Sequence, residues 1–301
     1  MPINRGIARL CLGAICISFA PVFVKMLGMD LMSPTSIAFW RMLIGSMILF
    51  TWASVKNGKV SISRLVLGWA ALAGILFSVD LFFWHRSIVY SGAGIATILA
   101  NTQVFGTAVL SFFIFKEKLT LKFLVAALAA FGGVALLVGF GSGIEMSTLY
   151  IRGVIYGLVT GLAYANFLVT LKYAGQKQAL PDFLTLIAWV SLFSALSLGI
   201  MVSIEGGVIM PPDLYSLFVL FLLALVAQTL GWWAITSGLS EVTASRAGLI
   251  ILLQPVLAAI WGILFFAEGL TPTQFAGAAL TLICIYLGSQ PKKKPIVPVA
   301  G

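Results

Sequence analysis

The chain has very few charged side chains. Only 9% of its 301 residues are Asp, Glu, Lys or Arg, whereas 61% are hydrophobic and the mean hydropathy is +1.10. A soluble domain devotes about a quarter of its residues to charge, because charged residues cover the surface that faces water. This scarcity of charge excludes a soluble globular protein, and lipid must be the main solvent of the folded chain.

The sequence is equally poor in residues that hold metals or catalyse reactions. It contains one histidine, His85, and three cysteines, Cys11, Cys16 and Cys284, which show no CxxC or Cys/His spacing. A membrane-embedded enzyme would need clustered His, Asp or Glu, or a nucleophile with a base beside it. We see no such cluster and predict no metal, no cofactor and no enzymatic activity.

Long apolar runs fill the chain from end to end. A helix needs roughly 20 mostly apolar residues to cross a hydrocarbon core of ~30 Å. Charges and Gly or Pro residues separate the runs, as at 56–59 and 205–213. On this template we predict ten transmembrane helices, at 6–28, 34–55, 64–86, 92–115, 120–140, 152–174, 181–204, 213–237, 243–266 and 271–289.

Lys and Arg are unevenly distributed between the two sides of the membrane. Ten spans place both termini on one side, and all but four of the 18 Lys and Arg residues fall on that side. Cytoplasmic loops carry such an excess, so we predict a bacterial inner-membrane protein with both termini in the cytoplasm. The net charge of +9 reflects this asymmetry, and no nucleic-acid partner is expected. The four exceptions are Lys25, Arg41, Arg86 and Arg152.

The two halves of the sequence resemble each other. When the chain is shifted along itself, Gln103 meets Gln254, and the phrase Phe-x-Glu-x-Leu-Thr at 115–120 recurs at 266–271. Each copy holds five predicted helices, and an odd number makes the second copy enter the membrane from the opposite side. We therefore predict an all-α integral membrane protein of ten transmembrane helices in two inverted-topology five-helix repeats, an architecture of secondary transporters. The repeats span 1–143 and 144–291, and a cytoplasmic tail follows at 292–301.

These repeated residues resemble a known family. Two five-helix halves, each with a Phe-x-Glu-x-Leu-Thr turn before its last helix, look like the EamA family of the drug/metabolite transporter superfamily. The stretches Asp80-Leu-Phe-Phe-Trp-His-Arg-Ser87 and Ala100-Asn-Thr-Gln103 are similar to bacterial exporters of aromatic amino acids. The first half departs from the pattern at Val104, where the second half has Pro255.

The resemblance implies secondary transport without ATP. Small metabolites, in particular amino acids with aromatic or hydrophobic side chains, would leave the cytoplasm by alternating access. The alternative is a multidrug transporter, or a sugar- or nucleoside-type transporter of the same superfamily. Phosphorylated substrates are disfavoured, because we place no Lys or Arg at the membrane midplane. The expected partners are a small-molecule substrate and membrane lipid, and the chain is compatible with a monomer.

Polar side chains inside the bilayer mark the candidate substrate site, because such groups are costly in lipid and usually face the interior of a helix bundle. The repeat-related Gln103 and Gln254 lead the set, since both fall near the middle of a predicted helix. The competing interpretations are interhelical hydrogen bonding for Asn and Gln, and packing against lipid for the aromatic residues. The candidates for lining the cavity are Phe19, Asp80, Trp84, Asn101, Gln103, Tyr164, Asn166, Gln228, Trp233 and Gln254.

Ionisable residues in the outer half of the membrane are candidates for a gate or an ion pair. These residues are Lys25, Arg41, Asp80 and His85. A carboxylate at the depth of Asp80 should attract a cation, and Lys25 or Arg41 lies at a similar depth. Three roles stay open for Asp80: a structural ion pair, an extracellular gate and a proton-coupling site. Glu117 and Glu268 precede helix starts and are expected to make structural turns.

Overall fold

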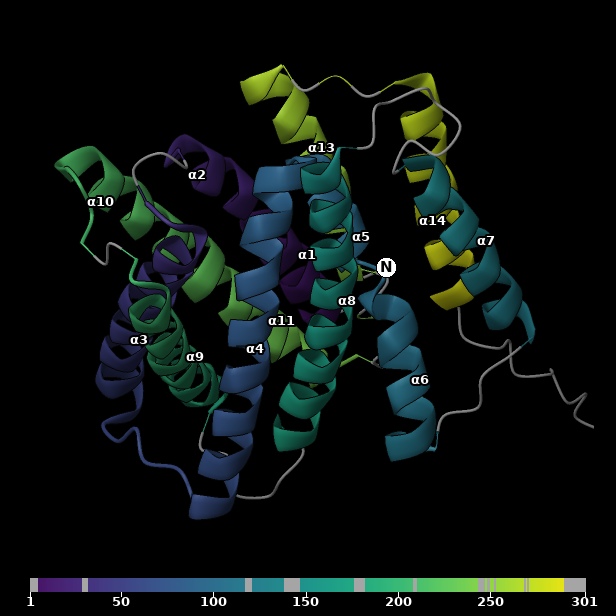
Figure 1. The fold of residues 1–301 in the computed structure, drawn as a ribbon. Coiled ribbons are helices and arrows are strands. Elements are labelled where there is room, and N and C mark those ends of the chain that lie inside the picture. The colour runs from purple at the N-terminus through teal and green to yellow at the C-terminus, as the bar shows by residue number, and fades with distance from the viewer. Residues whose placement is uncertain are drawn as a thin grey trace, which may run out of the picture.

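The computed structural model describes residues 5–28, 32–116, 121–137, 147–175, 182–207, 210–242, 247, 250–251, 253–267, 269 and 271–289. These residues form helices and turns, and no strand occurs among them; Figure 1 shows the helices packed side by side in a bundle. The elements are α1 (Arg5–Ser18), α2 (Ala20–Met26), α3 (Pro34–Asn57), α4 (Arg64–Ser91), α5 (Ala93–Ala100), α6 (Gln103–Phe115), α7 (Leu121–Leu137), α8 (Thr148–Gly175), α9 (Phe183–Glu205), α10 (Leu214–Leu222), η1 (Leu223–Gly231), α11 (Trp232–Leu239), α13 (Leu253–Phe266) and α14 (Pro272–Ser289).

Seven helical segments of the described chain are long and apolar enough to cross a membrane. Each coincides with one of the predicted spans, so these seven predictions are confirmed as helices of membrane length. The other three predicted spans, 120–140, 243–266 and 271–289, contain the shorter helices α7, α13 and α14. The seven segments are Arg5–Met26, Pro34–Asn57, Arg64–Ser91, Ile95–Ile114, Thr148–Ala174, Phe183–Glu205 and Leu214–Leu239.

Three of these segments are irregular in the middle. α1 gives way to α2 at Phe19, because Pro21 has no backbone N–H to donate to the preceding turn. Between α5 and α6 the backbone tightens, and the Thr102 N–H donates to the Leu99 carbonyl at 3.0 Å. The segment Leu214–Leu239 contains the π-helix η1. Irregular backbone at membrane depth is tolerated where it is buried in protein or lines a cavity, so the breaks point to the centre of the bundle.

The junction between α4 and α5 lies at Gly92, and α4 extends to Ser91 rather than to the predicted end at 86. The Gly92 N–H donates to the Ile88 carbonyl at 3.0 Å, and the φ angle of Gly92 is 89°. A positive φ is accessible to glycine at little cost, which is why the helix ends there. Arg86 is therefore part of a regular helix.

Pairs of long helices make up the core of the bundle. α4 packs along α8 and α9, α3 along α9, and α1 along α11, while α7 and α14 lie side by side at one edge (Figure 1). Gly74 allows α4 to approach α9, where Ser194 Oγ donates to the Gly74 carbonyl at 2.6 Å. Large apolar side chains such as Phe113, Leu128 and Ile204 are exposed on the outside, as a surface in contact with lipid requires. The predicted turn residues Glu117 and Glu268, the repeat boundary at 143–144 and the tail at 292–301 lie outside the described residues.

Candidate functional site

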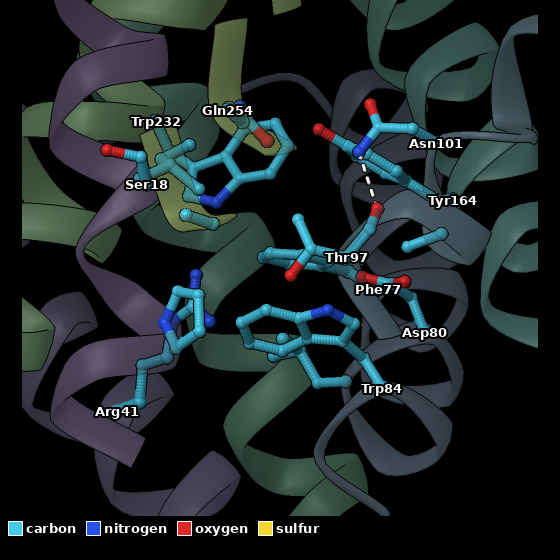
Figure 2. Close-up of a pocket in the computed structure, with 15 residues that line it drawn as sticks. Ser18, Arg41, Phe77, Asp80, Trp84, Thr97, Asn101, Tyr164, Trp232 and Gln254 are labelled. Atoms are coloured by element: carbon cyan, nitrogen blue, oxygen red, sulfur yellow. Dashed lines mark hydrogen bonds between the residues drawn. The ribbon is translucent and has the colours of Figure 1, made fainter. Parts of the chain in front are cut away.

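A small cavity lies at the centre of the bundle, where the interrupted helices meet (Figure 2). Its volume is about 50 Å³, which holds several water molecules but is well below the roughly 300–1,000 Å³ of typical ligand pockets. The walls come from α1, α2, α3, α4 and α5 in the first half of the chain and from α8, α11 and α13 in the second. The lining residues are Ile17, Ser18, Pro21, Arg41, Phe77, Asp80, Leu81, Trp84, Thr97, Ala100, Asn101, Tyr164, Trp232, Gln254 and Ala258.

Two opposite charges line this cavity. Arg41 of α3 is 2% exposed and Asp80 of α4 is 6% exposed. Within the described residues neither side chain forms a salt bridge, and the Arg41 Nε, which is buried, has no hydrogen-bond partner. The Arg41 guanidinium carbon instead lies 6.0 Å from the ring centroids of both Phe77 and Trp84. Buried charges are costly unless they are paired, so this arrangement is open to a charged ligand.

Aromatic rings form the apolar part of the wall. Phe77 of α4 stacks on Phe167 of α8 with their centroids 4.3 Å apart, and it meets the Trp232 ring of α11 edge-on at 4.9 Å. Tyr164 of α8 also meets Trp232 edge-on, at 6.0 Å. The cluster joins helices from both halves of the chain and presents apolar aromatic rings to the cavity.

Several polar atoms at the cavity lack a hydrogen-bond partner. The Trp232 Nε1, the Gln254 Nε2 and the Asn101 Oδ1 are all buried and unpartnered, whereas the Asn101 Nδ2 donates to the Thr97 carbonyl at 2.7 Å. Most buried polar atoms in proteins are hydrogen-bonded, and exceptions call for an explanation such as water or a ligand. The cavity therefore offers both donors and acceptors to a polar molecule.

Five of the ten residues predicted to line a cavity lie together here. They come from three different helices and the α5–α6 break, and Arg41, predicted as a gate or ion-pair residue, joins them. Arg41 and Asp80, both expected in the outer half of the membrane, line this same cavity. The five residues are Asp80, Trp84, Asn101, Tyr164 and Gln254.

The two repeat-related glutamines differ in their surroundings. Gln254 lines the cavity. Gln103 is also buried but is not part of the cavity wall, and its Oε1 accepts from Thr107 Oγ1 at 2.8 Å. Asn101 and Gln103 are two positions apart, and two positions turn a helix by about 200°, or about 240° through a 3₁₀ turn. With Asn101 at the cavity, Gln103 therefore points away from it.

The remaining polar candidates make contacts between or along helices. Gln228 of η1 is fully buried, and its Nε2 donates to Ser191 Oγ of α9 at 2.9 Å. Asn166 is exposed, and its Nδ2 donates to the Leu162 carbonyl of its own helix at 2.9 Å. Neither side chain belongs to the cavity wall.

The remaining aromatic candidates pack against other rings. Phe19 stacks on Trp261 of α13 with centroids 4.8 Å apart. Trp233 is tilted against Trp52 of α3 at 5.0 Å. Both contacts tie helices of the first half to helices of the second half, outside the cavity.

The other ionisable candidates lie apart from the cavity. The Lys25 Nζ is 4.7 Å from the Phe266 ring centroid. His85 is fully buried, with its Nδ1 at 2.7 Å from the Leu81 carbonyl and its ring edge-on to Trp84. Among the described residues, no group of three or more His, Cys, Asp or Glu side chains could hold a metal.

The cavity also contains residues that the sequence reasoning did not select. Ser18 and Trp232 stood close to selected residues in polar or aromatic runs, and that pattern was a usable signal. Phe77 and Thr97 gave no signal, because the first is one of 22 phenylalanines and the second is a small residue in an apolar helix.

A model of the EamA-like transporter family matches residues 4–139 and again residues 151–289. The chain belongs to the EamA-like transporter family. The family resemblance seen in the sequence is thereby confirmed, and this EamA-like protein is a multi-pass membrane transporter.

Relatives of this EamA-like transporter cover most of its length. The uncharacterized inner membrane transporter YhbE of Escherichia coli K12 is 27% identical over 296 residues, which cover 94% of this chain and 87% of YhbE. A probable amino-acid metabolite efflux pump of Salmonella typhimurium is 25% identical over 241 residues, 77% of this chain and 78% of that protein. A crystal structure with 13% sequence identity superposes with a TM-score of 0.70, covers 94% of this chain and 95% of the other, and shares its fold.

Proposed function

We propose that this transporter exports small metabolites, chiefly amino acids with aromatic or hydrophobic side chains, by alternating access at the central cavity. The observation that carries the proposal is the cavity wall itself. It combines an aromatic cluster around Phe77 and Trp232 with buried polar atoms that lack partners. A transported molecule that is part apolar and part polar matches such a wall. The Salmonella relative named as a probable amino-acid metabolite efflux pump supports amino-acid metabolites as the broad substrate class and efflux as the direction.

The contacts between helices support two related halves, because the contacts occur in matching pairs. The first helix of each predicted half packs against the third helix of the other, α1 against α11 and α8 against α4. The second helices, α3 and α9, pack together, as do the fifth helices, α7 and α14. The fourth helix of each half contacts the first of the other, α6 against α8 and α13 against α1. Exchange of the halves leaves this pattern unchanged, as a two-fold axis requires.

The directions of α3 and α9 support an axis in the membrane plane. Lys56 near the end of α3 pairs with Asp182 at the start of α9, and Thr35 at the start of α3 donates to Glu205 at the end of α9. The two helices are therefore antiparallel. A two-fold axis that exchanges antiparallel helices is perpendicular to them, as in the ten-helix, inverted-repeat architecture that we propose for residues 1–143 and 144–291. The Lys and Arg asymmetry supports cytoplasmic termini in this arrangement.

The small size of the cavity fits a closed stage of the transport cycle. An aromatic amino acid needs more room than about 50 Å³, so the halves must separate on one side before a substrate enters. The breaks at Phe19 and at Asn101 adjoin or include residues that line the cavity and are suitable hinge points, because the regular α-helix is already interrupted there.

A substrate panel in proteoliposomes tests the proposal. Proteoliposomes that contain the purified protein are loaded with tritiated L-phenylalanine. Efflux is then measured with and without a competing solute, which is an aromatic amino acid, a small amino acid, a sugar, a nucleoside or a cationic drug. We expect aromatic and hydrophobic amino acids to compete and the other classes to have little effect. Efflux that responds only to drugs, or only to sugars or nucleosides, would contradict the proposal and favour the multidrug or the sugar-type alternative.

A further inference from the structure

Arg41 and Asp80 carry opposite charges and line one cavity without contacting each other. Both side chains are buried, yet they form no salt bridge. If their role were to neutralise each other, the side chains would close to contact, because direct pairing is what offsets the cost of burying two charges. The separation leaves each charge available to a different group of a bound molecule.

The neutral polar atoms extend the same division. In Figure 2 the side chains of Arg41, Trp232 and Gln254 lie on one side of the cavity, and those of Asp80 and Asn101 lie on the opposite side. The atoms without partners on the first side are donors: the Arg41 Nε, the Trp232 Nε1 and the Gln254 Nε2. On the second side, where the Asp80 carboxyl group also lies, the atom without a partner is an acceptor, the Asn101 Oδ1.

The geometry points to recognition of the zwitterionic head group of a free α-amino acid, with Arg41 as the carboxylate subsite and Asp80 as the ammonium subsite. The carboxylate accepts from Arg41 and from the neighbouring donors Trp232 and Gln254, because a guanidinium offers several N–H groups in a fixed fork. The ammonium group donates to Asp80 and to Asn101. The substrate side chain then packs on the rings of Phe77 and Trp84. This assignment rests on the proposed amino-acid transport and adds a demand for both head-group charges.

Three ligands that share one aromatic side chain test the assignment. L-phenylalanine carries both charges, L-phenylalaninamide lacks the carboxylate, and 3-phenylpropionate lacks the ammonium group. Each competes with tritiated L-phenylalanine for binding to the purified wild-type protein in proteoliposomes. We expect the amide and the propionate each to bind at least about tenfold more weakly than phenylalanine, because each leaves one buried charge of the protein without a partner. This measurement needs no variant and is independent of effects on folding.

Two variants then assign each charge to its subsite. Arg41→Gln should reduce the preference for phenylalanine over the amide to less than about threefold and keep the preference over the propionate. Asp80→Asn should have the reverse effect. Arg64→Gln, on an exposed arginine at the start of α4, and Asp213→Asn, on an aspartate ahead of α10, serve as matched controls that keep both preferences. Arg41→Lys and Asp80→Glu retain the charges and should retain part of both preferences.

The outcomes separate this inference from the proposed function. If wild-type protein transports phenylalanine and binds the amide and the propionate equally well, the head-group assignment is wrong and amino-acid transport stands. If both variants lose both preferences to the same extent, the two subsites are wrong as assigned. If phenylalanine neither binds nor moves while another class of solute does, the proposed function fails, and the head-group assignment fails with it.

Discussion

The charged residues of the cavity and those at the two ends of α9 behave differently. At one end of α9, Asp182 Oδ2 accepts from Lys56 Nζ at 3.0 Å and from Asn57 Nδ2 at 3.1 Å. At the other end Glu205 accepts from Thr35 Oγ1 at 2.7 Å and pairs with Arg86, while in the cavity Arg41 and Asp80 remain apart. Contact between charges holds helices together, whereas separation keeps charges available for a ligand. Acidic and basic side chains therefore serve two purposes in this protein, and the packing around each pair determines whether its charges are in contact or apart.

The largest expected effect comes from removing a cavity charge. Arg41→Gln should lower kcat/KM for phenylalanine efflux at least about thirtyfold, because a hydrogen bond to a charged group contributes about 2 kcal/mol. Efflux from proteoliposomes measures the change, and Arg64→Gln on the exposed arginine should stay within twofold of wild type. An equal loss of kcat/KM in both variants would mean that Arg41, like the charges at the ends of α9, has a structural role and does not bind substrate.

The repeat-related glutamines provide a sharper contrast at smaller magnitude. Gln254→Ala should lower kcat/KM about fivefold, since a neutral hydrogen bond contributes about 1 kcal/mol. Gln103→Ala should leave kcat/KM nearly unchanged, because its side chain bonds Thr107 away from the cavity. Folded protein is verified for both by size-exclusion chromatography. An unchanged rate for Gln254→Ala would show that this glutamine only packs.

The paired charges at the end of α9 should affect stability rather than substrate binding. Glu205→Gln should lower the melting temperature by about 1–3 °C, because a partly exposed ion pair contributes at most about 1 kcal/mol. KM for phenylalanine should remain within twofold of wild type. In the Arg86→Gln/Glu205→Gln double variant the loss should be smaller than the sum of the single losses, as expected for residues in direct contact. A change in KM of more than twofold would mean that this end of α9 contributes to the transport step.

The smallest effect is a dependence of stability on pH at the opposite end of α9. Partial burial favours the neutral form of Asp182, but the hydrogen bonds from Asn57 and Lys56 outweigh it and lower the pKa of Asp182. A carboxyl whose pKa is lowered in the folded state stabilises the fold above its ordinary pKa of about 3.9 and loses that contribution as the pH falls through the lowered value. The melting temperature, followed by tryptophan fluorescence, should therefore fall less steeply between about pH 5 and pH 3 in Asp182→Asn than in wild type. Parallel curves would remove Asp182 from the stabilising contacts.

Much of the fold follows from patterns that lipid imposes on a sequence. Apolar length and the positions of charges located the seven long segments, and repeated polar residues indicated the family. The end of α4 was less accessible: the sequence predicts that the next helix starts at 92, but the structure is needed to show that α4 continues to Ser91 and that the chain turns at Gly92 with a positive φ.

The site was accessible to the same degree. Asp80, Asn101, Tyr164 and Gln254 were selected because polar groups are costly in lipid, and that argument needs no knowledge of packing. It does not say which polar residues meet, so it also selected Gln228, which bridges to α9 instead. Helix breaks change the rotation of everything that follows them, and aromatic residues carry no such cost, so the direction of Gln103 and the presence of Phe77 depended on tertiary structure.

The unpaired charges of the cavity have a kinetic consequence. A carrier must return to its starting orientation after it releases a substrate, and an empty return encloses Arg41 and Asp80 with nothing but water between them. A return with a second zwitterion on board neutralises both charges while the cavity is closed, so its barrier is lower. Exchange of one amino acid for another across the membrane should therefore run faster than net release. Substrate on the receiving side would then accelerate the turnover of this transporter.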